Sequence, residues 1–250
     1  MFASDKIRFR TTPRWGEKAN GKASSQHDQV MHGLGLGIVG GEFAENTMLP
    51  NEVDLLARFA VSRTVLREAL KSLSAKGMIL ARAKVGTRVT LRRDWNYFDP
   101  DILFWHATIG IDRSFLFNLA EMRLAFEPEA AALAAERRSD AHLVELAECI
   151  DEMERSHSSA EGFVGADLRF HTAIAEASGN PLMRSICYVI QVALEAAFMV
   201  SSPISSSSAH ALSVARHRMI AQAIELRDPD SARAAMRAVI LQGLKRIEAV

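Results

Sequence analysis

The chain has 250 residues, 48% of them hydrophobic, and a formal net charge of zero at pH 7. This composition excludes a disordered chain, and the length leaves room for two domains with cores of their own. Charge is divided unevenly, because the first 95 residues hold 16 Lys and Arg against 9 Asp and Glu, whereas the remainder holds 14 against 21. A basic front half and an acidic back half favour a polyanion-binding domain joined to one that avoids polyanions.

Residues 1–26 carry basic side chains, for example at positions 8, 10 and 14, but no apolar stretch. We expect a mobile basic arm and no secretory signal. The most apolar run, residues 186–200, is interrupted by polar side chains and is shorter than the roughly 20 residues of a membrane span. Cys149 and Cys187 have no metal-like spacing. We therefore expect no membrane partner and a location in the reducing cytoplasm.

Residues 27–92 are expected to form one small domain, which opens with a helix over residues 27–39. The inner face of this helix carries Val30, Leu34 and Ile38 at helical spacing. Glycines at positions 33, 35 and 37 weaken the helix, since each costs about 1 kcal/mol relative to alanine. Tertiary packing must therefore compensate for them.

A second short helix is predicted to begin near residue 50, and a turn at 60–61 leads into a helix over 62–77. Ser62 suits the N-cap of this helix, and Gly77 suits its C-terminal end. One face is apolar, with Val65, Leu66, Ala69, Leu70 and Leu73. The opposite face carries Arg63, Thr64, Arg67 and Lys71. The pattern is typical of a helix that reads the major groove of DNA, although a solvated amphipathic helix has it as well.

Two β-prone runs, residues 78–82 and 87–91, follow and are separated by a short segment that contains a glycine. They predict a hairpin with basic residues at its tip. Helix, turn, basic helix and hairpin together make a winged helix-turn-helix. The residues expected to contact DNA are Arg63, Thr64, Arg67 and Lys71 on the helix and Lys84, Gly86 and Thr87 at the hairpin tip.

The stretch LPNEVDLLARFAVSRTVLREALKSLSAKGMILARAKVGTRV resembles the DNA-binding domain of the GntR family of bacterial transcription regulators. The resemblance covers roughly residues 27–91 and implies a double-stranded DNA operator as the partner. Family members usually have a Pro-Gly turn after Gly40 and Gly41, where this chain has AENT at residues 44–47. That departure concerns loop stiffness and leaves the DNA-facing helix unaffected. One short helix reads few base pairs, so we also expect a homodimer on a near-palindromic operator.

Residues 93–111 are rich in large aromatic side chains and are expected to form a packed linker between two domains. Residues 112–250 show helical periodicity with no convincing strand, which predicts an all-helical effector-binding and dimerisation domain. The expected helices span residues 114–137, 140–157, 161–178, 181–200, a segment ending near 227, and 229–249. The predicted fold class is therefore mainly α, with a winged helix-turn-helix followed by an all-helical bundle.

Asp167 and His171 are four residues apart and so share one face of a helix. Such a pair can converge on one metal ion, although structural or surface pairs of this kind are commoner. Arg123 stands in an otherwise apolar stripe, where an inward guanidinium needs an anion and can bind a carboxylate bidentately. The alternative is a surface ion pair between Arg123 and Glu127, one turn away.

Together with the sequence EASGNP and the segment that begins at His217, these residues resemble the ligand-binding FCD domain of the FadR branch of GntR regulators. That domain is a helical bundle whose members commonly bind a divalent metal and a small carboxylate. The resemblance implies Arg123, Asp167, His171 and His217 as effector-binding residues. It implies the last three as ligands of a metal such as Zn, Ni or Mn.

The fourth metal ligand of that pattern is a histidine in the last helix, and this chain has Val239 there. His210 cannot replace it, because it lies two turns from His217, roughly 10 Å along a helix that rises 1.5 Å per residue. Two possibilities follow. Either water or ligand completes the shell of a bound metal, or the site is a metal-free pocket of polar groups.

The layout is most similar to the repressors of sugar-acid catabolism in this branch. It implies a ligand-responsive DNA-binding regulator that represses a catabolic operon for a sugar acid or related hydroxy acid and is released by that carboxylate. A metal-dependent regulator, or one that senses a lactate- or acyl-type acid, is the alternative within the family. A metal-dependent hydrolase would leave the basic domain without a role, and an architectural DNA binder would need no pocket-forming domain. We therefore expect no enzyme.

Overall fold

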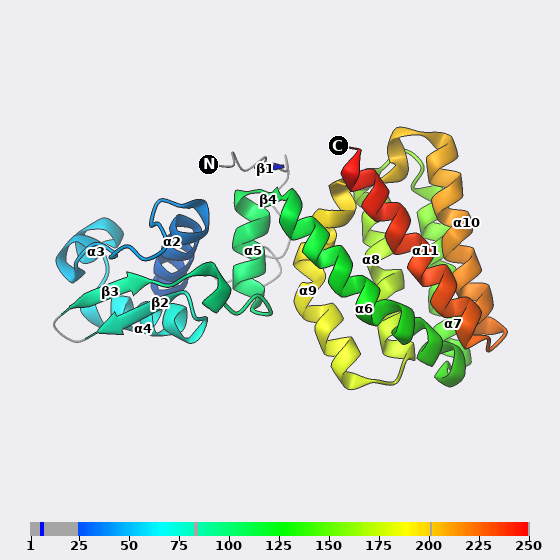
Figure 1. Ribbon diagram of the computed structural model, residues 1–250, viewed down its shortest axis with the longest axis horizontal. Helices are drawn as coiled ribbons and strands as arrows, with labels where there is room; N and C mark the ends of the chain where they lie inside the picture. Colours follow the sequence, from blue (N-terminus) through cyan, green and yellow to red (C-terminus); the bar gives the residue numbers. More distant parts are fainter. Residues whose placement is uncertain (1–5, 8–24, 83–84, 201, 250) are drawn as a thin grey trace. The chain divides into compact units, whose positions relative to one another are not determined.

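A computed structural model describes residues 6–7, 25–82, 85–200 and 202–249 (Figure 1). The chain is mainly helical and divides into two compact units, with the boundary after Ile111. The predicted fold class, a winged helix-turn-helix followed by a helical bundle, is confirmed. Most of the predicted basic arm, including its cations at positions 8, 10 and 14, lies outside the described residues. Within the described ranges, no helix is both long and apolar enough to span a membrane.

The N-terminal unit contains the predicted first helix, followed by the two helices and the hairpin of a winged helix-turn-helix. Its elements are α2 (Gln26–Gly40), α3 (Glu52–Phe59), α4 (Arg63–Ala75), β2 (Ile79–Arg82) and β3 (Gly86–Val89). The strands are antiparallel, with Ile79 opposite Val89. Ser62 caps α4, as predicted, by accepting a hydrogen bond from the backbone N–H of Val65. Buried residues of α2, α4 and both strands form one core, so the opposite face of α4 is left to solvent.

Helix α2 is complete despite its glycines, because aromatic rings pack directly against them. Its predicted inner-face residues are buried: Val30, Leu34 and Ile38. A Cβ atom at Gly35 would lie 2.5 Å from the ring of Trp105, and one at Gly33 would lie 2.7 Å from the ring of Phe59. Gly37 faces another phenylalanine ring in the same way. The buried aromatic surface offsets the helix-propensity cost that the glycines impose.

The aromatic segment after the hairpin packs within the N-terminal unit. It contains the short turn η1 (Arg92–Asp94) and helix α5 (Pro100–Ile109). Trp105 is buried and donates a hydrogen bond from Nε1 to Nδ1 of His32 at 2.7 Å. At the start of α5, Asp99 accepts hydrogen bonds from Lys76, which follows the last residue of α4. Helix α5 is therefore tied both to α2 and to the C-terminal end of α4.

The second unit is a helical bundle. The short strand β4 (Ile111–Asp112) spans the boundary, and the helices of this unit are α6 (Arg113–Arg137), α7 (Asp140–Arg155), α8 (Ala160–Ala177), α9 (Pro181–Val200), α10 (Ser207–Glu225) and α11 (Pro229–Glu248). These bounds agree with the predicted helices to within a few residues. Asp228 caps α11, with Pro229 in its first position, as predicted. Figure 1 shows α6 and α11 side by side, and apolar residues of α6, α7, α8, α10 and α11 form the core.

The two cysteines are buried in this bundle as free thiols. Cys149 lies on α7 and Cys187 on α9. Burial raises the pKa of Cys149 to about 11 and that of Cys187 to about 12. Both thiols are therefore protonated and poorly reactive near neutral pH.

Candidate functional site

The polar face of α4 is open to solvent. Its predicted DNA-facing residues are all exposed: Arg63, Thr64, Arg67 and Lys71. Glu52, at the start of α3, has carboxylate oxygens 3.7 Å from Nε of Arg63 and 3.5 Å from Nη2 of Arg67. Ion pairs this long and this exposed contribute little to stability. Both arginines can therefore exchange Glu52 for another anion at little cost.

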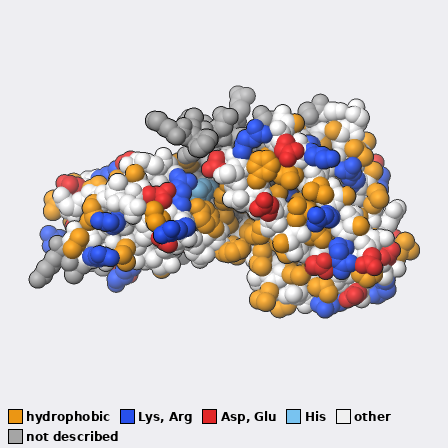
Figure 2. Space-filling view, in the orientation of Figure 1, with side chains coloured by type: hydrophobic (Ala, Val, Ile, Leu, Met, Phe, Trp, Pro, Cys, Tyr) orange, Lys and Arg blue, Asp and Glu red, His pale blue; other side chains and the backbone are white. Residues whose placement is uncertain are grey.

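The hairpin carries the other predicted DNA contacts. Gly86 and Thr87 begin β3, while Lys84 lies outside the described residues. Gly86 has a φ of +117°, and a Cβ atom there would lie 2.6 Å from Cε of Met48, so the position favours glycine. Figure 2 shows Lys and Arg side chains, in blue, on the visible face of the N-terminal unit. An exposed basic helix beside a hairpin suits a major groove and its flanking phosphates.

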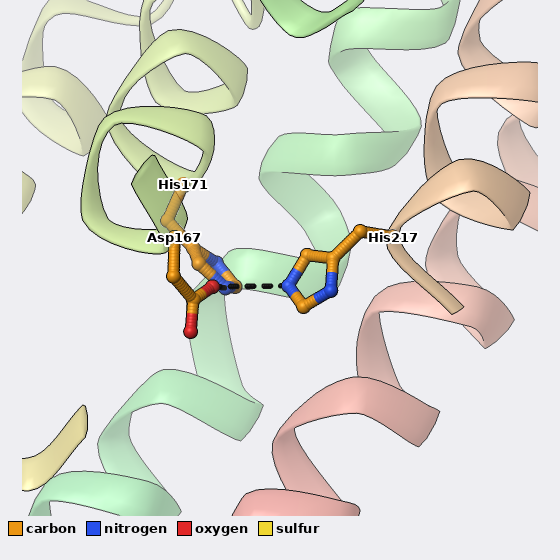
Figure 3. A group of neighbouring side chains, drawn as sticks. All are labelled: Asp167, His171 and His217. Atoms are coloured by element: carbon orange, nitrogen blue, oxygen red, sulfur yellow. Dashed lines mark hydrogen bonds and ion pairs between the residues drawn. The ribbon is translucent and has the colours of Figure 1, made fainter. Parts of the chain in front are cut away.

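A second group of polar residues lies inside the helical unit (Figure 3). His171 Nε2 is 3.3 Å and His217 Nε2 is 3.0 Å from the same oxygen, Oδ1 of Asp167. One ligand-type atom from each residue can be chosen so that all three atoms lie within 4.8 Å of one another. All three side chains are largely buried. The structure thus brings together three residues from separate parts of the sequence that the family resemblance placed in one site.

Helices α8 and α10 position these side chains. Asp167 and His171 lie one turn apart on α8, and His217 comes from α10. Nδ1 of His217 donates a hydrogen bond to the backbone oxygen of Ser213 at 2.8 Å, which leaves Nε2 directed at Asp167. The ring of Phe170 meets both imidazole rings edge to face. Hydrogen bonds and ring packing therefore fix the orientation of His217, and ring packing restrains that of His171.

Arg123 enters the same cluster from α6, paired with Glu127. Nε of Arg123 donates to Oε1 of Glu127 at 2.6 Å, and Nη2 donates to Oε2 at 3.2 Å. Their side chains are only 9% and 3% exposed, so the pair that the sequence allowed on the surface forms inside the bundle. Oε2 of Glu127 also lies 2.7 Å from Nδ1 of His171. The guanidinium of Arg123 stacks over Phe198, 4.6 Å from the ring centroid.

The charges in this cluster stabilise one another. Burial by itself raises the pKa of Glu127, but Arg123 and His171 outweigh it and lower that pKa to about 2. Burial likewise raises the pKa of Asp167, but His217 and His171 hold it well below its usual range. Burial lowers the pKa of His171, yet Glu127 and Asp167 outweigh burial and leave that pKa raised. Both carboxylates are therefore ionised near neutral pH and balanced by cationic or polar partners.

Two residues of this region were not predicted as site residues. The sequence predicted Glu127 only as a possible surface partner of Arg123, although Glu127 lies one turn from Arg123 along an apolar stripe, which is a signal that it points inward. Arg246 of α11 is partly buried, and although Asp167 raises the pKa of its guanidinium, burial lowers that pKa more. No sequence signal separated Arg246 from other basic residues near a helix C-terminus. His210 is hydrogen bonded to a backbone carbonyl at 2.8 Å, in keeping with its exclusion by spacing.

The donor set of the cluster fits a divalent metal ion. Two imidazole nitrogens and a carboxylate oxygen converge. Nδ1 of His217 is hydrogen bonded to the carbonyl of Ser213, as in metal-bound histidines, while Nδ1 of His171 lies at ion-pair distance, 2.7 Å, from Oε2 of Glu127 without forming a hydrogen bond. With its Nδ1 donating, a neutral His217 directs a lone pair at Oδ1 of Asp167, so a cation or a proton must lie between them. Val239 is buried and cannot ligate. The residues suit three protein ligands, and they equally suit the metal-free polar pocket that the sequence left open.

A winged helix-turn-helix with an exposed basic helix, joined to a helical unit with a buried charged cluster, defines the class of DNA-binding transcription regulators. The chain belongs to the gntR family of bacterial regulatory proteins, whose sequence profile matches residues 26–89, and residues 118–242 match the FCD domain. The family consists of transcription regulators and not enzymes, as expected from the sequence. The hydrolase alternative is therefore excluded.

Relatives agree with this assignment. The chain is 29% identical over 223 residues, 89% of its own length and 97% of the relative, to the galactonate operon transcriptional repressor of Escherichia coli K12. It is 32% identical over 205 residues, 81% of its length and 87% of the relative, to the HTH-type transcriptional regulator YieP of the same strain. A solved structure titled "Lar controls the expression of the Listeria monocytogenes agr system and mediates virulence" shares the fold, with a TM-score of 0.60, 21% identity, and coverage of 92% and 100% of the two chains. The first relative, named as a galactonate operon repressor, agrees with the expected similarity to sugar-acid repressors of this family.

Proposed function

We propose that the protein is a ligand-responsive repressor, which leaves its operator when a sugar acid or related hydroxy acid binds the helical unit. The observation that carries this proposal is the buried cluster of Arg123, Glu127, Asp167, His171 and His217. Buried charges are costly, and a bundle of this size does not need them for packing. The name of the relative that represses a galactonate operon supports a sugar acid as the ligand class.

Arg123 is the residue through which we propose that the acid's carboxylate binds. Glu127 engages its Nε and Nη2, so Nη1 is the atom that a carboxylate would approach. Arg246 would supply a second guanidinium on the side of Asp167. The hydroxyl groups of the ligand would bind Asp167 and the imidazoles, which can both donate and accept hydrogen bonds. A hydroxy acid offers both kinds of contact in one small molecule.

Asp167, His171 and His217 would hold the divalent metal, with Zn, Ni or Mn suited to their nitrogen and oxygen donors. When bound, such an ion supplies a positive centre that attracts carboxylate and hydroxyl oxygens. Glu127 orients the ring of His171, and the Ser213 carbonyl orients that of His217. In the metal-free pocket, the same two contacts would direct the imidazole nitrogens of His171 and His217 toward a bound ligand.

In the N-terminal unit, the proposed DNA contacts are Arg63, Thr64, Arg67 and Lys71 of α4 and Lys84, Gly86 and Thr87 of the wing. Glu52 holds the two arginines loosely, so phosphates and base edges can displace it. Each phosphate contact adds to the salt dependence of binding. One helix covers few base pairs, and we therefore propose a homodimer on a near-palindromic operator in the cytoplasm.

The proposal is tested with an operator selected from random double-stranded DNA by the full-length protein. Binding is measured by fluorescence anisotropy while galactonate, other aldonic acids, lactate or an acyl-type acid is titrated, with and without Zn, Ni or Mn. We expect a sugar acid to weaken operator binding at least tenfold, which corresponds to about 1.4 kcal/mol of coupling between the two sites. Release only by lactate or the acyl-type acid would support the alternative regulator. Intact operator binding that no acid weakens, under any metal condition, would overturn the effector proposal.

A further inference from the structure

The solvent face of α10 carries an apolar stripe. Leu212 and Met219 of α10 are 48% and 59% exposed, and Leu226, the C-cap residue that follows its last residue, is 77% exposed. The three recur at intervals of seven residues. Ala215 and Gln222 are also exposed and fall between them, which completes the alternating three- and four-residue spacing of a coiled-coil seam. These five residues, here called the α10 seam, extend over roughly 21 Å at 1.5 Å per residue.

The seam is a second face of a helix that is already packed on its first face. His217, Ile220 and Ile224 are buried on the inner side of α10, within the bundle. The outer face of a surface helix is normally polar, whereas a heptad-spaced apolar stripe is suited to packing against another helix. Figure 1 shows α10 at the edge of the helical unit, beside α11. The seam is therefore accessible within its own unit and has the spacing of a helix-pairing surface.

Charged residues beside the seam indicate what would cover it. Arg218 and Glu225 are exposed, seven residues apart, on one flank of the seam. If a second copy of α10 packs antiparallel about a two-fold axis, Arg218 faces Glu225 of the partner subunit, and symmetry repeats the ion pair. In a parallel pair, Arg218 would instead lie against Ala223 of the partner subunit, with no opposite charge. The charge pattern is thus self-complementary in the antiparallel arrangement.

The same flank also offers apolar surface beyond the seam. A groove of about 250 Å³ lies between α7 and α10, and Arg218 and Glu225 are among the residues that line it. Its apolar lining comes from Leu143, Leu146, Ala147 and Ile150 of α7 and from Ala221 of α10. A helix that packs on the seam would cover this groove as well, which enlarges the apolar area removed from water.

We infer that the α10 seam is a contact surface between two copies of this chain, packed antiparallel with reciprocal Arg218 and Glu225 ion pairs. The inference rests on the proposed function in one respect: it names the surface through which the proposed homodimer forms. It needs neither an operator nor an effector, so association of the protein alone tests it. A failure of the effector proposal would leave that measurement unchanged.

Sedimentation velocity of the full-length protein over a range of concentrations provides the test. Met219→Glu places a charge at the centre of the seam and should weaken self-association at least tenfold. Val53→Glu, at an exposed position on α3, is the matched control and should associate like the parent. Far-UV circular dichroism and thermal unfolding establish that each variant remains folded. A monomeric parent, or a folded Met219→Glu variant that associates like the parent, would overturn the inference.

Charge exchange tests the antiparallel arrangement and does not depend on a seam variant that could fail to fold. Arg218→Glu and Glu225→Arg should each weaken association, and the double variant should restore most of it. Because Arg218 also pairs with Glu154 in its own chain, Glu154→Gln serves as the control for loss of that ion pair. No recovery in the double variant would contradict the reciprocal pairs. Dissociation by Leu182→Glu on α9, with no effect of Met219→Glu, would assign the contact to another face and overturn the inference.

Discussion

Replacing Arg123 by methionine should destabilise the helical unit strongly. The substitution removes the guanidinium that, together with His171, outweighs the effect of burial and lowers the pKa of Glu127 to about 2, and it leaves that carboxyl group almost fully buried without its main partner. Removing one partner of a buried ion pair typically costs about 3 to 5 kcal/mol, because the remaining charge loses its compensation. Glu127→Met should cost a similar amount, since it leaves Arg123 without its carboxylate.

The double variant Arg123→Met, Glu127→Met should recover much of this loss. Apolar side chains of similar volume can replace a buried pair with little change in stability, so the double substitution should cost far less than the sum of the single ones. His171 also contacts Glu127, which means that recovery stops short of the parent's stability. The cycle therefore separates the cost of an unpaired charge from the contribution of the pair itself.

Urea unfolding at pH 7, in the presence of a chelator, gives the required free energies. Far-UV circular dichroism is the appropriate signal, because residues 112–250 contain no tryptophan. Single variants within about 1 kcal/mol of the parent, or single effects that simply add in the double variant, would refute the reasoning. Either result would mean that the cluster is solvated in solution.

Three further predictions concern other parts of the molecule. Arg67→Ala should weaken operator binding by about 1 to 3 kcal/mol and reduce the slope of affinity against salt, and equal affinities at several salt concentrations would remove this residue from the interface. Gly77→Ala should lower the stability of the N-terminal unit more than Gly41→Ala, measured by tryptophan fluorescence, because a Cβ atom at Gly77 would lie 2.3 Å from a backbone oxygen, whereas one at Gly41 meets nothing within 4 Å. Both positions have positive φ, so the difference isolates the steric contact. Val239→His should tighten Zn binding in calorimetry at least tenfold by restoring the missing ligand, and His217→Ala should abolish it; unchanged affinity in both would exclude this metal site.

The fold was predictable from the sequence largely because its local signals agree with one another. Ser62 caps α4, Asp228 and Pro229 start α11, and the apolar stripes of both units point to their cores. The glycines of α2 lower the helix propensity of that segment. The aromatic rings packed against them, such as Trp105 against Gly35, explain why the helix nevertheless forms. Helix propensity depends on neighbouring residues and therefore cannot predict a contact between residues so far apart in the chain.

The candidate site was predictable where its residues share a helix and less so elsewhere. Asp167 and His171 follow from their spacing, because residues one turn apart share a face. His217 was assigned to the site by family resemblance. Its contact with Asp167 depends on how α8 and α10 pack, which the sequence does not show. Whether Glu127 lies inside or outside depends on the rotation of α6 in the bundle, which the sequence pattern left open.

The most direct test of the account is the operator affinity of the full-length protein at increasing concentrations of galactonate, measured in parallel with direct calorimetric binding of the same acid. We expect galactonate or a related sugar acid to bind the parent protein and to lower its operator affinity at least tenfold, which corresponds to about 1.4 kcal/mol. Arg123→Ala should abolish both effects, measured under conditions in which far-UV circular dichroism shows the variant folded, because loss of this guanidinium also destabilises the helical unit. Binding of the acid that is undiminished in both Arg123→Ala and His171→Ala, or saturation by the acid with no change in operator affinity, would contradict it.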